Sequence, residues 1–306
     1  ALVLAAQETA TDADFMRVES VIAHEYFHNW SGNRVTCRDW FQLSLKEGLT
    51  VFRDQEFSAD LHSRPVQRID DVTHLRRLQF AEDAGPLAHP IRPDNYIEIN
   101  NFYTMTVYEK GAEVIRMFRT ILGAEAYRKA TDLYFLRHDG DAATCDDWIK
   151  CMEDASGKDL TQFKLWYSQA GTPRVTFKGH YNDTTKTYTV ELSQSIPDTP
   201  GQTGKKPMHI PVAIGLIGPK GEDLIGTQIL HLTQAEQSFT FDNIENKPVP
   251  SVLRNFSAPV NLSTNLGDDD YIFLTKNEIY DGFNRWEAGQ YLHRKVLDQL
   301  TGAFEN

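Results

Sequence analysis

The segment His24-Glu25-Tyr26-Phe27-His28 is the part of the sequence whose residue types and spacing point most directly to chemistry. On a helix, residues four apart lie on one face with their Cβ atoms about 6 Å apart, so both imidazoles can bind one Zn²⁺. Glu25 then lies beside the metal rather than on it, where it can take a proton from the metal-bound water. The pattern predicts a hydrolytic zinc site, although a helix can also carry two histidines on one face without any metal.

A catalytic zinc needs a third protein ligand, and Glu47 in Leu45-Lys46-Glu47-Gly48-Leu49 is the candidate. Eighteen residues separate His28 from Glu47, which is enough for a turn and a second helix packed against the first. Gly48 costs about 1 kcal/mol inside a helix, and it is explained if these two helices approach each other very closely there. The other histidines show no matching pair and are expected to be surface or satisfied interior residues.

Zinc-bound imidazoles usually donate their second N–H group to a carboxylate or a carbonyl. One turn after Glu47 stands Val51, which cannot accept a hydrogen bond, whereas Asp54 or a backbone carbonyl could. The sequence leaves both alternatives open. Cys37 lies near the zinc helix and is expected to serve in packing, because hydrolysis by a metal-activated water needs no thiol nucleophile.

The first 170 or so residues, which must position this site, read mainly as helical. Thr11-Asp12-Ala13-Asp14 resembles a capping box, and the helix it opens should stop at Asn29-Trp30-Ser31-Gly32-Asn33. A second helix is predicted over residues 43–57, so the two helices carry all three candidate ligands. Further helical patterns cover residues 65–80, 107–122, 124–138, 144–155 and 159–169.

The pattern changes at Gly171-Thr172-Pro173, after which short stretches alternate with the period of a half-buried strand. Strands are predicted at residues 175–177, 187–193, 210–216, 238–241 and 249–253. After Asp268-Asp269-Asp270 the pattern is helical again. We therefore expect an α+β multi-domain chain. Its parts are a mostly helical domain at residues 1–171, a small β-sandwich at 172–263 and the start of an α-helical C-terminal domain at 264–306.

Composition limits the partners and the setting of the protein. Its 306 residues predict about two domains. The net charge of −12 argues against nucleic acid, because phosphate contacts need a basic surface. No apolar run is long enough to cross a bilayer, so no membrane partner is expected. The three cysteines fit no paired framework and indicate a reducing compartment, the cytoplasm. The chain lacks an initiator Met and is expected to be an internal fragment of something longer.

Four stretches of the sequence are similar to a known family. The segments His24-Glu25-Tyr26-Phe27-His28-Asn29-Trp30-Ser31-Gly32-Asn33-Arg34-Val35-Thr36 and Lys46-Glu47-Gly48-Leu49-Thr50 closely resemble the aminopeptidase N family of zinc metallopeptidases (gluzincins), and most closely its bacterial branch. The resemblance extends through Tyr108-Glu109-Lys110-Gly111-Ala112-Glu113-Val114-Ile115-Arg116-Met117 and Trp166-Tyr167-Ser168-Gln169-Ala170-Gly171-Thr172-Pro173. It covers most of the chain.

The resemblance implies a thermolysin-like, mostly helical catalytic domain that binds one Zn²⁺ per chain and removes N-terminal residues from peptides with a free N-terminus. It assigns His24, His28 and Glu47 as zinc ligands and Glu25 as the general base. Tyr108 matches the family tyrosine that donates a hydrogen bond to the developing oxyanion, and such a donor is typically worth about 3–4 kcal/mol. From the residues alone, Tyr108 reads as a core aromatic, and Tyr103 is its nearest competitor for the role.

The chain departs from the family pattern in one respect. The family holds the substrate's α-amine with the glutamate of a Gly-Ala-Met-Glu-Asn strand just before the zinc helix, and no such motif occurs here. Glu109 and Glu113 are expected to be surface or structural carboxylates rather than substitutes. One alternative is a fragment that is inactive alone because this strand and the N-terminal and C-terminal domains of its parent are missing. The other is a related gluzincin with a different substrate.

Overall fold

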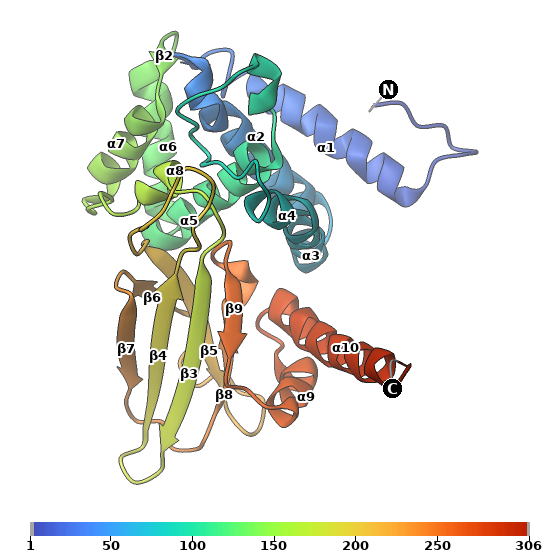
Figure 1. Ribbon diagram of the computed structural model, residues 1–306, viewed down its shortest axis with the longest axis vertical. Coiled ribbons are helices and arrows are strands. Elements are labelled where there is room, and N and C mark those ends of the chain that lie inside the picture. Colours follow the sequence, from blue (N-terminus) through green and yellow to red (C-terminus); the bar gives the residue numbers. More distant parts are fainter. Residues whose placement is uncertain (1–2, 305–306) are drawn as a thin grey trace. The chain divides into compact units, whose positions relative to one another are not determined.

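The computed structural model describes residues 3–304 and confirms the α+β class expected from the sequence. The chain divides into two compact units, one of residues 1–172 with 197–208 and one of residues 173–196 with 209–306. The first unit is mainly helical, and the second holds the long strands and the last two helices (Figure 1). The division into three domains after residues 171 and 263 stays a prediction. Within residues 3–304, no helix is both long enough and apolar enough to cross a membrane.

The first unit is built from helices and one short parallel strand pair. Its α-helices are α1 (Asp12–His28), α2 (Leu43–Leu61), α3 (Arg64–His74), α4 (Phe80–Asp83), α5 (Gly111–Leu122), α6 (Ala124–His138), α7 (Cys145–Ser156) and α8 (Leu165–Ser168). Two π-helical turns, η2 (Leu75–Gln79) and η4 (Thr106–Lys110), lie within longer helical stretches, and η1 (Trp40–Gln42) and η3 (Ile99–Phe102) are 3₁₀ turns. The strand pair is β1 (Thr36–Cys37) with β2 (Ala142–Ala143). Helices near residues 43–57, 65–80, 107–122, 124–138 and 144–155 were predicted correctly.

Helix α1 begins and ends where its sequence signals predict. Thr11 Oγ1 accepts a hydrogen bond from the Asp14 amide at 3.3 Å, and Asp14 Oδ2 accepts one from the Thr11 amide at 2.9 Å. This capping box satisfies two amide groups that a helix start otherwise leaves unpaired. After His28 the chain turns through Gly32, whose φ of 135° favours glycine.

Helix α2 is largely buried although it carries charged and polar side chains. It packs against both α1 and α5. Glu47 is 2% exposed and Asp54 is 5% exposed. Thr50, fully buried, shares a hydrogen bond of 2.7 Å with the hydroxyl of Ser31. A buried charge is costly unless it is paired, so the partners of these carboxylates must be sought nearby.

The predicted helix over residues 159–169 is wrong for most of its length, since only Leu165–Ser168 form α-helix. Gly157 takes a left-handed conformation that ends α7, and the Asp159 carboxylate then accepts a hydrogen bond from the Thr161 amide at 2.8 Å. Such a local bond offers the backbone an alternative to helix. Leu160 and Phe163 are buried at a helix-like spacing, which explains the misleading pattern.

The second unit contains two sheets within the described part of the chain. One has the strand order β7-β4-β3-β9 and the other the order β6-β5-β8. The strands are β3 (Arg174–Asn182), β4 (Thr187–Ser195), β5 (Ile210–Ile217), β6 (Gln228–Leu232), β7 (Glu236–Phe241), β8 (Val249–Val252) and β9 (Asn261–Thr264). Strands β6 and β9 were not predicted. All neighbouring strands are antiparallel except β3 and β9, which are parallel.

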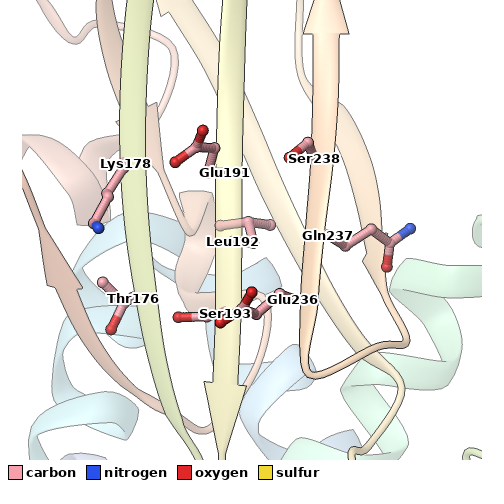
Figure 2. Close-up of a pocket in the computed structure, with 8 residues that line it drawn as sticks. All are labelled: Thr176, Lys178, Glu191, Leu192, Ser193, Glu236, Gln237 and Ser238. Carbon is pink, nitrogen blue, oxygen red and sulfur yellow. The ribbon is translucent and has the colours of Figure 1, made fainter.

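A shallow hollow lies on one face of the sheet formed by β3, β4 and β7 (Figure 2). Lys178 is paired with Glu191 across β3 and β4, and Glu191 is paired with Ser238 across β4 and β7. These three side chains are polar and exposed, while Leu192, the next residue along β4, is buried. None of the eight lining residues is a histidine or a cysteine, so this hollow offers neither a soft metal ligand nor a strong nucleophile.

The final helices, α9 (Asp268–Asn277) and α10 (Gly282–Phe304), are joined to the strands by one buried cation. Arg254, 2% exposed, donates to Glu278 Oε2 at 3.0 and 3.1 Å and to Asp223 Oδ2 at 2.6 Å. Glu278 lies between the two helices and is fully buried. Gly215 makes room for the guanidinium, because a Cβ there would lie 2.1 Å from its central carbon.

Replacing Arg254 by methionine should destabilise the second unit by about 3–5 kcal/mol, because Glu278 and Asp223 would remain buried without their counter-charge. The free energy of unfolding from urea titration measures this loss. Arg285→Met is the matched control, since Arg285 is exposed and should change stability by less than about 0.5 kcal/mol. Equal stability of the two variants would contradict the assignment.

Candidate metal centre

Three side chains from α1 and α2 converge on one point. The Nε2 atoms of His24 and His28 lie 3.2 and 3.1 Å from the same oxygen of Glu47, Oε2. One ligand atom from each residue lies within 4.8 Å of the other two, and the imidazole centroids are 4.5 Å apart. The structure thus brings together the three residues that the sequence singled out as ligands.

Each imidazole is held by a partner on its other nitrogen. His24 Nδ1 lies 2.8 Å from Asp54 Oδ2, and His28 Nδ1 lies 2.8 Å from the carbonyl oxygen of Ser31. Both alternatives that the sequence left open are therefore used, one for each histidine. Asp54 follows Glu47 by seven residues, or two helical turns, so the two carboxylates share a face of α2. Because both Nδ1 atoms face acceptors, each must carry a proton.

The atoms that meet at the centre are the Nε2 atoms of the two histidines and Oε2 of Glu47. When Nδ1 carries the proton, Nε2 of a neutral imidazole is an acceptor, and so is the Glu47 carboxylate. Acceptors this close repel one another unless a proton or a cation lies between them. Two imidazole nitrogens and a carboxylate oxygen are a donor set that zinc prefers in hydrolytic sites. The residues present therefore fit a divalent zinc ion.

The charges around Glu47 favour its ionised form. Burial alone would raise the pKa of Glu47, but hydrogen bonds from His24 and His28 and the ammonium of Lys46 hold it well below its usual range. For His24, burial would lower the pKa, yet the contacts with Asp54 and Glu47 outweigh it and raise the pKa to about 9. In the metal-free protein, protonated His24 therefore supplies the positive charge that a metal ion would otherwise supply.

A glycine contact fixes α2 against α5. A Cβ on Gly48 would lie 2.7 Å from the carbonyl carbon of Gly111, so the two backbones touch at this point. The expectation that Gly48 allows α2 to approach α1 is wrong. The side chains of His24, His28 and Glu47 fill the space between α1 and α2, and the close approach is to α5 instead.

Tyr108 lies on η4, three residues before Gly111, and faces the ligand group. Its ring is nearly parallel to that of His24, with centroids 6.2 Å apart. Burial, reinforced by the Glu47 and Glu25 charges, raises the pKa of Tyr108, so its phenol stays protonated and can donate. Tyr103 is more exposed, at 48%, with its ring 6.4 Å from that of Tyr108.

The other predicted residues take the following places. Glu25 is exposed on α1, and its charge acts on the Tyr108 hydroxyl. Glu113 is a structural carboxylate, 3% exposed, that accepts two hydrogen bonds of 2.6 Å from Arg68. Burial raises the pKa of the Cys37 thiol to about 11, which suits a packing role and not a nucleophile.

Glu109 behaves differently from a surface carboxylate. Its side chain is 16% exposed, and Gln55 Nε2 donates to it at 3.5 Å. Burial, with the nearby charges of Asp71 and Asp54, raises the pKa of Glu109 to about 8, so it is mostly protonated at neutral pH. Its position beside Tyr108 in the sequence gives no sign of this environment, because Asp54 and Asp71 lie on α2 and α3.

Comparisons with known proteins match this chain to peptidases. The profile of the peptidase family M1 domain matches residues 1–167, and that of a domain of unknown function with an Ig-like fold matches residues 171–265. Aminopeptidase N of Escherichia coli (strain K12) is 59% identical over 298 residues, which is 95% of this chain and 34% of that protein. Aminopeptidase N of Haemophilus influenzae is 51% identical over 99% of this chain and 36% of its own length.

A solved structure is also similar. The aminopeptidase A of Legionella pneumophila, crystallised in complex with aspartic acid, matches with a TM-score of 0.85 and 33% identity. The match covers 98% of this chain and 33% of that one. The chain thus spans about a third of the length of the curated relatives and of the structure that it matches.

Zinc affinity of this centre should rise with pH. Since the pKa of His24 is about 9 without metal, an incoming ion must displace a proton at neutral pH. Affinity should therefore increase about tenfold per pH unit from about 7 to 8.5 and level off above the pKa. Competition with a chelator at fixed free zinc measures it, with His62→Gln as a control, because His62 is exposed and paired with Glu19. A flat profile would contradict the assignment.

Proposed function

The chain belongs to peptidase family M1, and from that premise we propose that it carries the zinc centre of an aminopeptidase that removes N-terminal residues from peptides. His24, His28 and Glu47 are the proposed ligands of one Zn²⁺. The observation that carries the proposal is the meeting of their three acceptor atoms within 4.8 Å, with both histidines held from behind. A catalytic zinc uses three protein ligands and keeps a fourth position for water or substrate.

The proposed chemistry divides between the metal and two side chains. Zinc, when bound, polarises the scissile carbonyl and lowers the pKa of water at the site. Glu25 accepts the proton of the attacking water and then delivers it to the leaving amine, so it ends the cycle ionised as it began. Its exposure supports this role, because its carboxylate is open to solvent in the described part of the chain.

Tyr108 is the proposed donor to the oxyanion that forms on the carbonyl carbon. Its raised pKa keeps the phenol protonated throughout the working pH range. A neutral donor aimed at the position of developing charge strengthens its hydrogen bond in the transition state more than in the ground state. The ring also packs against the apolar cluster of Leu43, Phe102 and Val107, so the core placement expected from the residues alone and the catalytic role are compatible.

The proposed substrate class is a peptide with a free α-amine. The relatives named aminopeptidase N support it, and so does the net charge of −12, which is favourable for a cationic end. No Gly-Ala-Met-Glu-Asn motif occurs among the 306 residues, so we propose that the groups holding the α-amine come from the rest of the full-length protein.

Replacing Glu25 by glutamine should lower kcat/KM for leucine and alanine amides by about 10²–10⁴-fold, because glutamine cannot accept the proton. The protein to test is the full-length, zinc-loaded one. Zinc content, measured by elemental analysis, should stay at one per chain, since Glu25 is not a ligand. Glu125→Gln, an exposed glutamate on α6, is the control and should leave turnover unchanged. Near-normal turnover of Glu25→Gln with zinc bound would refute the base assignment.

Blocking the substrate's amine should abolish cleavage. A peptide and its N-acetylated form should differ by at least about 100-fold in kcat/KM, because an exopeptidase spends much of its binding energy on the free amine. Product analysis by mass spectrometry should find single residues released from the free peptide only. Ready cleavage of the acetylated peptide would exclude an aminopeptidase while leaving the metal centre and the Glu25 assignment intact.

A further inference from the structure

Two adjacent carboxylates at the end of α4 hold both ends of the π-helical turn η4, on which Tyr108 lies. Glu82 Oε2 accepts hydrogen bonds from the Thr106 amide at 2.7 Å and from the Thr106 hydroxyl at 2.6 Å. Thr106 is the first residue of η4. The carboxylate therefore caps the start of the helix that continues through α5, where unpaired amides and the helix dipole favour a negative charge.

The next residue holds the other end. Lys110, the last residue of η4, donates from Nζ to Asp83 Oδ2 at 2.8 Å and to the carbonyl oxygen of Gly171 at 2.9 Å. Thr172 Oγ1 donates to the same Asp83 oxygen at 2.9 Å. Both side chains of the ion pair are 1% exposed. Burial would raise the pKa of Asp83, but the Lys110 ammonium outweighs it and keeps the pKa low, so the Asp83 carboxylate is ionised.

The turn between these two anchors has a wide, rarely used geometry. The Gly111 amide reaches back five residues to the Thr106 carbonyl, which defines a π-helical turn. Such turns are seldom kept without a specific constraint and are frequent at functional sites. A second π-helical turn, η2, precedes α4, and its last residue, Gln79, donates to the Thr106 hydroxyl at 3.2 Å. Side chains of three residues in the η2–α4 segment, Gln79, Glu82 and Asp83, thus make hydrogen bonds to η4.

We propose that Glu82 and Asp83 are positioning residues that fix the π-helical turn η4 and, through it, the direction of the Tyr108 hydroxyl. The inference rests on the proposed function, in which Tyr108 donates to the oxyanion. An oxyanion donor must be placed accurately, and a displacement of about 1 Å can cost about 100-fold in rate. Tyr108 lies between Thr106 and Lys110, so it cannot shift along the helix while both anchors hold.

A double-mutant cycle distinguishes a positioning role of Glu82, which acts through Tyr108, from a purely structural role. The variants are Glu82→Ala, Tyr108→Phe and the two combined, in the full-length, zinc-loaded protein. Glu82 is half-buried, so its removal is less disruptive than breaking the buried Lys110–Asp83 pair. Glu153→Ala is the matched control. Glu153 is also half-buried and caps a backbone amide, that of Leu160 at 3.3 Å, far from η4 in the chain.

We expect Tyr108→Phe to lower kcat about 100-fold. Glu82→Ala should lower kcat about tenfold with little change in KM, because placing the oxyanion donor affects the transition state and not substrate binding. In the Tyr108→Phe background the same change should lower kcat less than about twofold, since no hydroxyl is left to position. Glu82→Gln keeps an acceptor oxygen for the Thr106 amide and should recover most of the activity. Glu153→Ala should leave kcat unchanged in both backgrounds.

A second measurement does not depend on activity. Hydrogen exchange of the amides of residues 106–111, followed by mass spectrometry without metal, should be faster in Glu82→Ala than in Glu153→Ala. An equal loss of kcat on Glu82→Ala with or without the Tyr108 hydroxyl would overturn the inference, and so would unchanged exchange. Normal kcat in Tyr108→Phe would overturn the proposed role of Tyr108, and the inference with it. The cycle therefore separates the two failures.

Discussion

Three lone pairs that point at one another are the constraint on which the rest of the first unit depends. The Nε2 atoms of His24 and His28 and the carboxylate of Glu47 would repel without a positive charge between them. The fold holds them in place through contacts made behind each group. Asp54 and the Ser31 carbonyl hold the histidines, and Lys46 lies against the outer oxygen of Glu47. A buried polar helix, α2, is the consequence.

Helix α2 is spaced from α1 and from α5 in two different ways. On one side, α2 faces α1 across the ligand side chains. On its other side, Gly48 touches Gly111 without any side chain between them. Glu47 precedes Gly48 by one residue, and Tyr108 precedes Gly111 by three. The contact of two glycines therefore constrains how far Tyr108, the proposed oxyanion donor, can lie from His24, His28 and Glu47, and a methyl group there would change that distance.

The sequence predicts which side chains converge better than it predicts what surrounds them. His24 and His28 are predicted from helical spacing and Glu47 from its place on a second predicted helix, and the capping box at Thr11 fixes the start of α1. The π-helical turn around Tyr108 could not be foreseen, because the carboxylates bonded to its two ends, Glu82 and Asp83, are more than 20 residues away. The parallel pairing of β9 with β3 is also non-local. The helix predicted over residues 159–169 is wrong because the Asp159 side chain, and not a backbone carbonyl, accepts the hydrogen bond of the Thr161 amide, although the apolar spacing there is helical.

We interpret the buried ion pairs of the described residues as contacts that fix the relative orientation of the segments they join. Lys110 with Asp83, Arg68 with Glu113 and Arg254 with Glu278 are all almost inaccessible to water. Apolar residues of similar volume would often give equal or greater stability, so stability alone does not account for them. Each pair joins segments at least 24 residues apart, and directional bonds fix how these segments are rotated and shifted, which apolar contacts do only loosely. In the first unit the segment so fixed carries Tyr108. The proposed zinc ligands and the proposed oxyanion donor are therefore held by different ion pairs and hydrogen bonds, on segments that touch at Gly48 and Gly111 and that bring the rings of His24 and Tyr108 together.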